Sequence, residues 1–230
     1  MFIRYRQMAV AACAALLVIA SASSSIQAQQ VPTLRVYIAR HGQTDGNLNR
    51  IAQGWTDTPL NETGRQHAAL LAQRLQGVQL DGIYSSTLSR SRETAQTVAA
   101  TKRGVTVVSL PELREVNLGR FENLKFDDPA LKTRPLGEER GPEDGEKPSE
   151  VSARIKTAVD TIRAKYQSGT VLIVGHAGIV GNVMRHLMNL TPQDVAGISM
   201  ANDELYMVEL PQGFPPKVFK FIPQANFKEL

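Results

Sequence analysis

Two short apolar runs that each lead into a histidine constrain the fold of this chain more than any other feature. The first covers residues 34–39 and is followed by Arg40-His41-Gly42, and the second covers residues 170–175 and is followed by His176. Both runs are rich in branched side chains and stop abruptly, which is typical of buried strands. In open α/β sheets, ligands bind at the carboxyl ends of the strands. We therefore expect Arg40, His41 and His176 to share one crevice.

Helical and strand patterns alternate over the rest of the chain. The expected helices cover residues 61–78, 88–102, 149–166 and 179–190, and the further strands cover residues 82–85, 105–110, 204–210 and 218–222. The helix that begins at Leu88 places Arg90 in its first turn. This alternation predicts an α/β fold, a three-layer α/β/α sandwich around a mostly parallel mixed sheet with an antiparallel edge.

Residues 120–150 interrupt this alternation. Fifteen of these 31 residues are charged, nine acidic and six basic, and four are proline. A segment of this composition buries little apolar surface, so we expect an excursion over the surface that stays outside the core. Two interpretations are open for it, a lid over the site and a solvated loop.

The first 28 residues have the pattern of a secretory signal peptide. Arg4 and Arg6 precede an uncharged apolar stretch over residues 8–20, and small residues follow up to Ala28. This order is typical of a cleaved export signal, and the alternatives are a retained anchor and a buried helix. We expect one domain over residues 29–230 of an exported protein, periplasmic or secreted. That domain would hold no thiol, because Cys13 is the only cysteine.

The charge balance disfavours several classes of partner. The formal net charge is +4, but residues 1–28 hold two arginines and no acid, so residues 29–230 carry 24 bases, 22 acids and a net charge of +2. So small a charge, without a basic stripe, gives no argument for nucleic acid. The apolar stretch over residues 8–20 is shorter than the roughly 20 residues of a membrane span, so stable insertion is not expected. The oligomeric state stays open.

The residue types at the predicted crevice indicate an anion site. Two guanidinium groups, on Arg40 and Arg90, and two imidazoles, on His41 and His176, converge without a cluster of carboxylates. This set suits a tetrahedral dianion such as phosphate, because arginine binds phosphate oxygens through paired hydrogen bonds. We expect a small phosphorylated substrate and no cofactor or metal. A zinc site on the two histidines is the alternative, which the flanking arginines disfavour.

Five blocks of residues occur around these positions in a fixed order. They are Arg40-His41-Gly42 with Gln43-Thr44-Asp45-Gly46-Asn47, Gly54-Trp55-Thr56-Asp57-Thr58-Pro59-Leu60-Asn61-Glu62-Thr63-Gly64, Ser85-Ser86-Thr87-Leu88-Ser89-Arg90-Ser91-Arg92-Glu93-Thr94-Ala95, Leu113-Arg114-Glu115 with Gly119-Arg120-Phe121-Glu122, and Val174-Gly175-His176-Ala177-Gly178. In this order they resemble the histidine phosphatase superfamily, the phosphoglycerate mutase-like group, and specifically its first branch.

The resemblance implies a covalent mechanism. His41 would attack phosphorus and become a phosphohistidine, while its other ring nitrogen donates to a fixed acceptor such as a backbone carbonyl. Glu115 would protonate the leaving oxygen and then activate water. Glu112 competes for this acid role, and Glu115 occupies the matching position in the block.

The resemblance also implies that preorganised donors hold the phosphate oxygens, with no metal ion. The residues that match this role are Arg40, Arg90, Asn47 and His176. We expect packing or surface roles for the other conspicuous side chains nearby in sequence, which are Trp55, His67, Arg92 and His186.

The implied function is a metal-independent phosphomonoesterase. Residues 144–146, Asp-Gly-Glu, are only loosely similar to the family's Gly-Gly-Glu stretch. The excursion over residues 120–150 is also shorter than the segment by which phosphoglycerate mutases hold a second phosphate. Both departures favour a phosphatase over a phosphoglycerate mutase-type phosphotransferase, which is the first alternative. A phosphate-ligand binding module without turnover is the second.

Overall fold

The computed structural model describes residues 31–132, 144–198, 200–222 and 226–229, which contain a seven-stranded sheet. The strands are β1 (Thr33–Arg40), β2 (Gly82–Ser85), β3 (Val107–Ser109), β4 (Gly169–Gly175), β5 (Leu205–Pro211), β6 (Lys217–Ile222) and β7 (Asn226–Glu229). They lie in the order β3-β2-β4-β1-β5-β6-β7. β3, β2, β4 and β1 are parallel to one another, and β5, β6 and β7 add an antiparallel edge. The strand β7 lies beyond the two closing strands that the sequence predicts.

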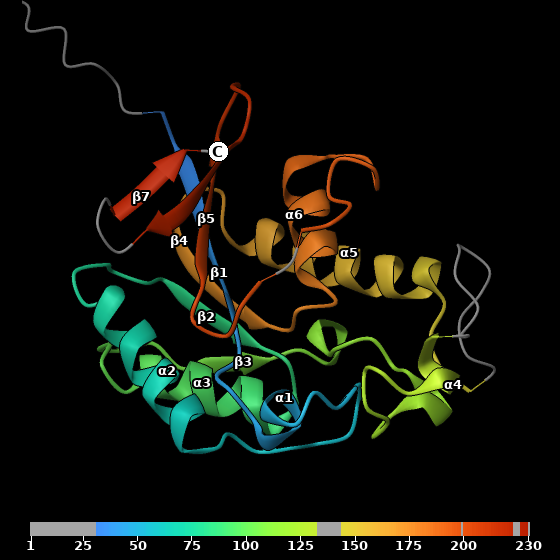
Figure 1. The fold of residues 1–230 in the computed structure, drawn as a ribbon. Coiled ribbons are helices and arrows are strands. Elements are labelled where there is room, and N and C mark those ends of the chain that lie inside the picture. Colours follow the sequence, from blue (N-terminus) through green and yellow to red (C-terminus); the bar gives the residue numbers. More distant parts are fainter. Residues whose placement is uncertain (1–30, 133–143, 199, 223–225, 230) are drawn as a thin grey trace, which may run out of the picture. The chain divides into compact units, whose positions relative to one another are not determined.

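Helices cover both faces of the sheet (Figure 1). They are α1 (Asp45–Leu48), α2 (Glu62–Arg74), α3 (Ser89–Ala99), α4 (Pro129–Lys132), α5 (Pro148–Lys165) and α6 (Val180–Met188), with 3₁₀ turns at Pro111–Leu113 and Gly119–Phe121. One apolar cluster joins the sheet to α5 and α6, and a second joins its other face to α2 and α3. The predicted three-layer sandwich is therefore confirmed.

The alternation of side chains along β1 explains why it lies at the centre. Val36 and Ile38 pack in the cluster with α5 and α6, whereas Tyr37 and Ala39 pack in the cluster with α2 and α3. All four side chains are buried, as expected for a strand covered on both faces. Burying an aliphatic side chain of this size stabilises the fold by roughly 1.5–3 kcal/mol.

The register of β1 and β4 brings the two histidines to the same edge of the sheet. Arg40 pairs with Gly175 in the parallel ladder, so His41 and His176 follow at equivalent positions. The backbone N–H of His41 donates to the carbonyl of Gly175 at 3.0 Å. The expected crevice at the carboxyl ends of the strands therefore has its two histidines on neighbouring strands.

The excursion over residues 120–150 buries more apolar surface than its composition predicts. Phe121 and Leu131 are only 5% and 7% exposed and pack with Ala52 in a small separate cluster. The expectation is wrong at these two positions, because single apolar residues spaced among charges can still converge in space. Residues 133–143 of the excursion lie outside the described residues.

Two predictions concern residues or partners outside this fold. The predicted signal peptide, residues 1–28, lies outside the described residues and stays a prediction. Within residues 31–229, so far as the structure describes them, no helix is both long and apolar enough for a membrane span.

Candidate active site

His41 lies at the carboxyl end of β1 with its ring almost fully buried, at 2% exposure. Its Nδ1 is 2.7 Å from the backbone carbonyl oxygen of Gly42. A carbonyl oxygen can only accept, so Nδ1 carries the proton and the lone pair is on Nε2. The expected backbone acceptor is therefore the carbonyl of Gly42, and Nε2 is the ring nitrogen left for nucleophilic attack.

The surroundings of His41 keep its ring neutral. Burial lowers its pKa well below the usual value of 6.5, and the charges of Arg40 and Arg90 lower the pKa further. The contact with the Gly42 carbonyl acts in the opposite direction but is the smaller effect. A neutral imidazole is the form that can attack phosphorus.

His176 lies beside His41, with the ring centroids 5.1 Å apart and the planes tilted by 55°. Its Nε2 is 2.7 Å from the hydroxyl of Ser86, and that hydroxyl also accepts from the backbone N–H of Leu88. Burial lowers the pKa of His176 well below 6.5, and His41 and the two site arginines lower it further. Ser86 therefore orients one nitrogen of this ring, which leaves Nδ1 for another partner.

Backbone carbonyls orient the two arginines. Arg90 is 1% exposed and donates from Nη1 to the carbonyl of Thr56 and from Nη2 to the carbonyl of Gly54, both at 2.8 Å. Arg40 donates from Nη1 to the carbonyl of Met200 at 2.9 Å. Burial lowers the pKa of each guanidinium, and the charge of Glu115 opposes that effect in both.

Three buried side-chain nitrogens at this site have no hydrogen-bond partner among the described residues. They are Nε of Arg40, Nε of Arg90 and Nδ1 of His176. Leaving a buried polar group unpaired costs about 1–3 kcal/mol, and more where it is charged. Three such groups next to one neutral imidazole indicate a site that binds an anion with several oxygens.

Asn47 adds a fourth side chain suited to an anion. Its Oδ1 accepts from the backbone N–H of Thr44 at 3.1 Å and from the Thr44 hydroxyl at 3.0 Å. These two contacts fix the orientation of the amide, because a backbone N–H can only donate. The Nδ2 group is then the side that can donate to a ligand.

Glu115 faces this site from the loop after the first 3₁₀ turn. Its Oε1 accepts from the N–H of Val116 at 2.9 Å, and its Oε2 accepts from the N–H of Gly178 at 3.1 Å. A Cβ at residue 178 would clash with the carboxylate in this position, so any other residue there would displace the Glu115 side chain. Glu115 lines the same cavity as His41, and Glu112 does not line it.

The site cavity has a volume of about 430 Å³. Five of the six predicted site residues line it, namely Arg40, His41, Asn47, Arg90 and Glu115. The sixth, His176, lies directly against the ring of His41. His67 and His186 do not line the cavity, in agreement with the packing or surface roles expected for them.

Arg154 is a residue that the sequence analysis misses, and it holds the loop that carries Glu115. It donates to the backbone carbonyls of Glu112 and Arg114 at 2.6 and 2.7 Å and to that of Glu115 at 2.9 Å. It also forms a largely buried ion pair with Glu146 at 2.6 Å. Trp55, expected only to pack, donates to the same Glu115 carbonyl at 2.7 Å. Both side chains therefore fix the backbone from which the Glu115 side chain projects.

Glu122 is a second missed residue, and it holds the loop whose carbonyls orient Arg90. Its carboxylate accepts from the N–H of Trp55 at 2.7 Å, and from the N–H and hydroxyl of Thr56 at 2.9 and 2.8 Å. Gly54 in this loop has φ of +51°, and a Cβ there would clash with the Glu122 carboxylate. Glu122 thus positions Arg90 through the loop without contacting it.

We expect the substitution Glu122→Gln to lower kcat/KM for a phosphate ester by about 100-fold, since an error near 1 Å in a positioned group has effects of that size. Glutamine offers one acceptor where the loop needs two, so the carbonyls that hold Arg90 would shift. The affinity for inorganic phosphate should fall in parallel. Glu62→Gln, which alters an exposed pair with Arg65, is the control. If Glu122→Gln has normal kinetics and only a lowered melting temperature, Glu122 stabilises the fold and does not position Arg90.

The two buried histidines also predict how stability depends on pH. Below pH 6.5 both histidines become protonated in the unfolded chain. In the folded protein they stay neutral, because their folded pKa values are lowered. Their contribution is therefore complete above pH 6.5 and is lost as the pH falls, by up to about 1.4 kcal/mol per pH unit for each ring. The free energy of unfolding, measured with urea at several pH values between 7.5 and 5, should fall less steeply with falling pH for His176→Asn than for wild type. Equal slopes would contradict the prediction.

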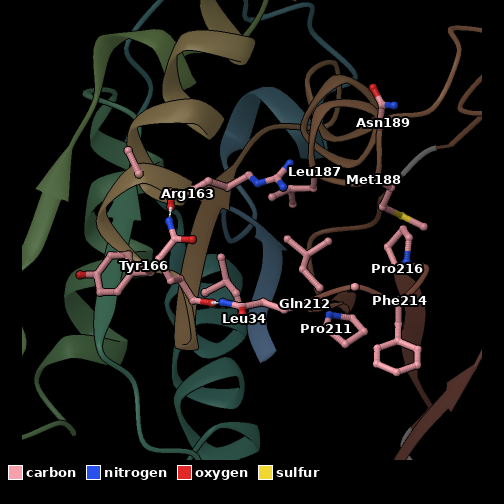
Figure 2. A pocket seen from close by; sticks show the side chains of 14 residues that line it. Leu34, Arg163, Tyr166, Leu187, Met188, Asn189, Pro211, Gln212, Phe214 and Pro216 are labelled. Carbon is pink, nitrogen blue, oxygen red and sulfur yellow. Dashed lines mark hydrogen bonds between the residues drawn. The ribbon is translucent and has the colours of Figure 1, made fainter. Parts of the chain in front are cut away.

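A second hollow, of about 540 Å³, lies at the other end of β1. Figure 2 shows its lining, which includes Leu34, Arg163, Tyr166 and Phe214. It is larger than the cavity at His41, but Arg163 is the only charged side chain among the residues that line it. The residues that line it include no histidine and no acidic residue, whereas five of the six candidate site residues line the smaller cavity.

Known proteins resemble this chain in sequence and in fold. The family model of the histidine phosphatase superfamily (branch 1) matches residues 36–218, which include all six candidate site residues. The "Probable phosphoglycerate mutase GpmB" of Yersinia pestis (strain Pestoides F) is 34% identical over 184 residues, which are 76% of this chain and 85% of the relative.

Solved structures show the same similarity. Bacillus stearothermophilus YhfR has 31% identity and a TM-score of 0.69, over 78% of this chain and 93% of that chain. A mycobacterial glucosyl-3-phosphoglycerate phosphatase has 28% identity and a TM-score of 0.68, over 77% of this chain and 90% of that chain.

Proposed function

The chain belongs to branch 1 of the histidine phosphatase superfamily, and from that premise we propose that it is a metal-independent phosphomonoesterase. The observation that carries the proposal is the set of three unpartnered buried nitrogens, on Arg40, Arg90 and His176, around the neutral ring of His41. This set suits three phosphoryl oxygens held in front of a nucleophile. The substrate class is a small phosphate monoester.

In the proposed first step, the Nε2 lone pair of His41 forms a bond to phosphorus and the bond from phosphorus to the ester oxygen breaks. The proton stays on Nδ1, which donates it in a hydrogen bond to the Gly42 carbonyl, and this contact stabilises the positive charge on the ring. The protonated carboxyl of Glu115 gives its proton to the leaving oxygen, so the product is a neutral alcohol. Arg40, Arg90, His176 and Asn47 bind the phosphoryl oxygens.

In the proposed second step, a water oxygen attacks phosphorus and the bond from phosphorus to Nε2 breaks. The Glu115 carboxylate takes one proton from that water, which restores the acid used in the first step. The products are inorganic phosphate and free His41. The same donors serve both steps, because the phosphoryl group moves only between two oxygens and Nε2.

In the experiment that tests this proposal, the purified full-length protein is incubated with p-nitrophenyl phosphate in excess chelator, and product release is measured. We expect release of nitrophenolate and inorganic phosphate, and rapidly quenched samples should contain an acid-labile phosphoryl group on His41, located by mass spectrometry of peptides. Loss of activity in chelator would favour the zinc alternative. Transfer to added alcohols in preference to water would favour a mutase-type phosphotransferase, a reaction suggested by the name of the Yersinia relative.

We also propose that residues 1–28 direct export of the protein. The proposal is supported by the order of charged, apolar and small residues in that segment. Amino-terminal sequencing of the protein recovered from the extracytoplasmic fraction of its cells should give a chain that begins at Gln29. A cytoplasmic protein that keeps Met1 would contradict it.

A further inference from the structure

The cavity at His41 is lined by a polar group and an apolar group of side chains. Arg40, His41, Asn47, Arg90 and Glu115 form the polar group. Apart from the polar Gln53, the other side chains that line the cavity are apolar, namely Ile51, Ala52, Val116, Leu118, Phe126 and Ala177. The leaving group of a phosphate ester held at His41 would extend along this apolar side.

Phe126 is the most exposed of the large apolar side chains in this group, at 52%. It is held there by backbone contacts and is not part of a loose loop. Its N–H donates to the carbonyl of Arg50 at 2.9 Å, and the neighbouring residues Ile51 and Lys125 form an antiparallel bridge. An exposed aromatic ring fixed at the mouth of a cavity is suited to contact with a ligand.

The charges around the cavity disfavour a second anionic group on the substrate. Among the described residues that line it, Arg40 and Arg90 are the only lysine or arginine side chains. Both guanidinium groups donate to backbone carbonyls and would hold the phosphoryl group, so neither is left for a second anion. Lys125, beside Phe126 in the sequence, is exposed and is followed by Asp127 and Asp128.

We propose that the preferred substrates are monoesters of uncharged alcohols with an aromatic or bulky apolar group, and that Phe126 selects them by packing against that group. The inference rests on the proposed phosphatase activity. An aromatic pair contributes about 0.5–1.5 kcal/mol beyond the burial of its area, so a preference of about 10-fold over a small polar alcohol is expected. The contact is made in both the ground and transition states, so it should lower KM.

The test uses three esters whose leaving groups are all alkoxides: 2-phenylethyl phosphate, glycerol 1-phosphate and 3-phosphoglycerate. Wild type should hydrolyse the first with a kcat/KM about 10-fold above the second, and the third should be the poorest. Phe126→Ala should lower kcat/KM for the phenyl ester about 10-fold and so abolish the preference, with a much smaller effect on glycerol 1-phosphate. Phe214→Ala, which removes an exposed ring at the other hollow, is the matched control.

The affinities of 2-phenylethylphosphonate and ethylphosphonate separate this inference from the proposed function. Both compounds resist hydrolysis, and the single tryptophan, Trp55, lies close enough to the site to report binding by fluorescence. One outcome is that no ester is hydrolysed, but 2-phenylethylphosphonate binds 10-fold tighter than ethylphosphonate and loses this advantage in Phe126→Ala. The specificity then stands and the phosphatase proposal fails. A preference for 3-phosphoglycerate, or equal affinities that Phe126→Ala does not change, would overturn the specificity.

Discussion

Replacing His41 with alanine is expected to lower kcat for phosphate ester hydrolysis by about 10⁴-fold or more, because it removes the nucleophile of a covalent mechanism. The phosphoryl group on the protein should disappear as well. Affinity for inorganic phosphate should change far less, since Arg40, Arg90 and His176 keep their backbone and hydroxyl partners. Initial rates, quenched-flow labelling and phosphate titration measure these three quantities on one protein.

His67→Ala is the matched control for His41→Ala. His67 lies on α2, and it does not line the site cavity. We expect its activity to stay within a few-fold of wild type. If His41→Ala releases phosphate as fast as wild type, His41 is not the nucleophile. The next candidate would then be His176, whose ring lies 5.1 Å away.

Replacing Glu115 with glutamine is expected to lower kcat by about 10²–10⁴-fold, the usual contribution of a general acid or base. The two steps should respond differently to p-nitrophenyl phosphate. Nitrophenolate leaves without a proton, so the first step should proceed almost normally. Attack of water still needs a base, so the phosphohistidine should accumulate. Rapid mixing should therefore show a burst of one nitrophenolate per protein, followed by a slow steady rate.

An ester with an alkoxide leaving group gives the complementary result for Glu115→Gln. Its first step needs the proton, so the burst should vanish and no phosphohistidine should build up. Glu112→Gln is the control, because Glu112 holds the neighbouring position in sequence but does not line the cavity. A burst in Glu112→Gln with normal kinetics in Glu115→Gln would transfer the acid role to Glu112.

The parts of the fold that the sequence predicts are those with a periodic signal. The runs at 34–39 and 170–175 are largely apolar, as expected for strands covered on both faces, and both lie inside the sheet. The sequence predicts one crevice for His41 and His176 only if the two strands are neighbours, and the structure shows that they pair. The outer strand β7 and the buried Phe121 were not predicted, because short edge strands and isolated apolar residues leave no comparable period.

The side chains that position the site could not be predicted for a different reason. Glu122 and Arg154 act on backbone N–H and carbonyl groups of loops, which every residue possesses. No residue type in those loops signals the contact. Glu122 lies in one of the five blocks, so the sequence indicates that its position matters. Its role becomes evident only from its contacts in the structure. Ser86 is similar, since a hydroxyl becomes informative only when an imidazole lies 2.7 Å away.

The late position of β5 has a consequence for the order in which the ribosome makes this protein. β1 lies between β4 and β5, and residues from the approach to β5 complete the site. The carbonyl of Met200 accepts from Arg40, and the side chain of Asn202 donates to the carbonyl of His41 at 2.7 Å. A nascent chain that has emerged only as far as His176 carries both histidines but lacks these contacts. Phosphatase activity should therefore arise only once synthesis has passed β5, so a prematurely terminated chain releases no active fragment.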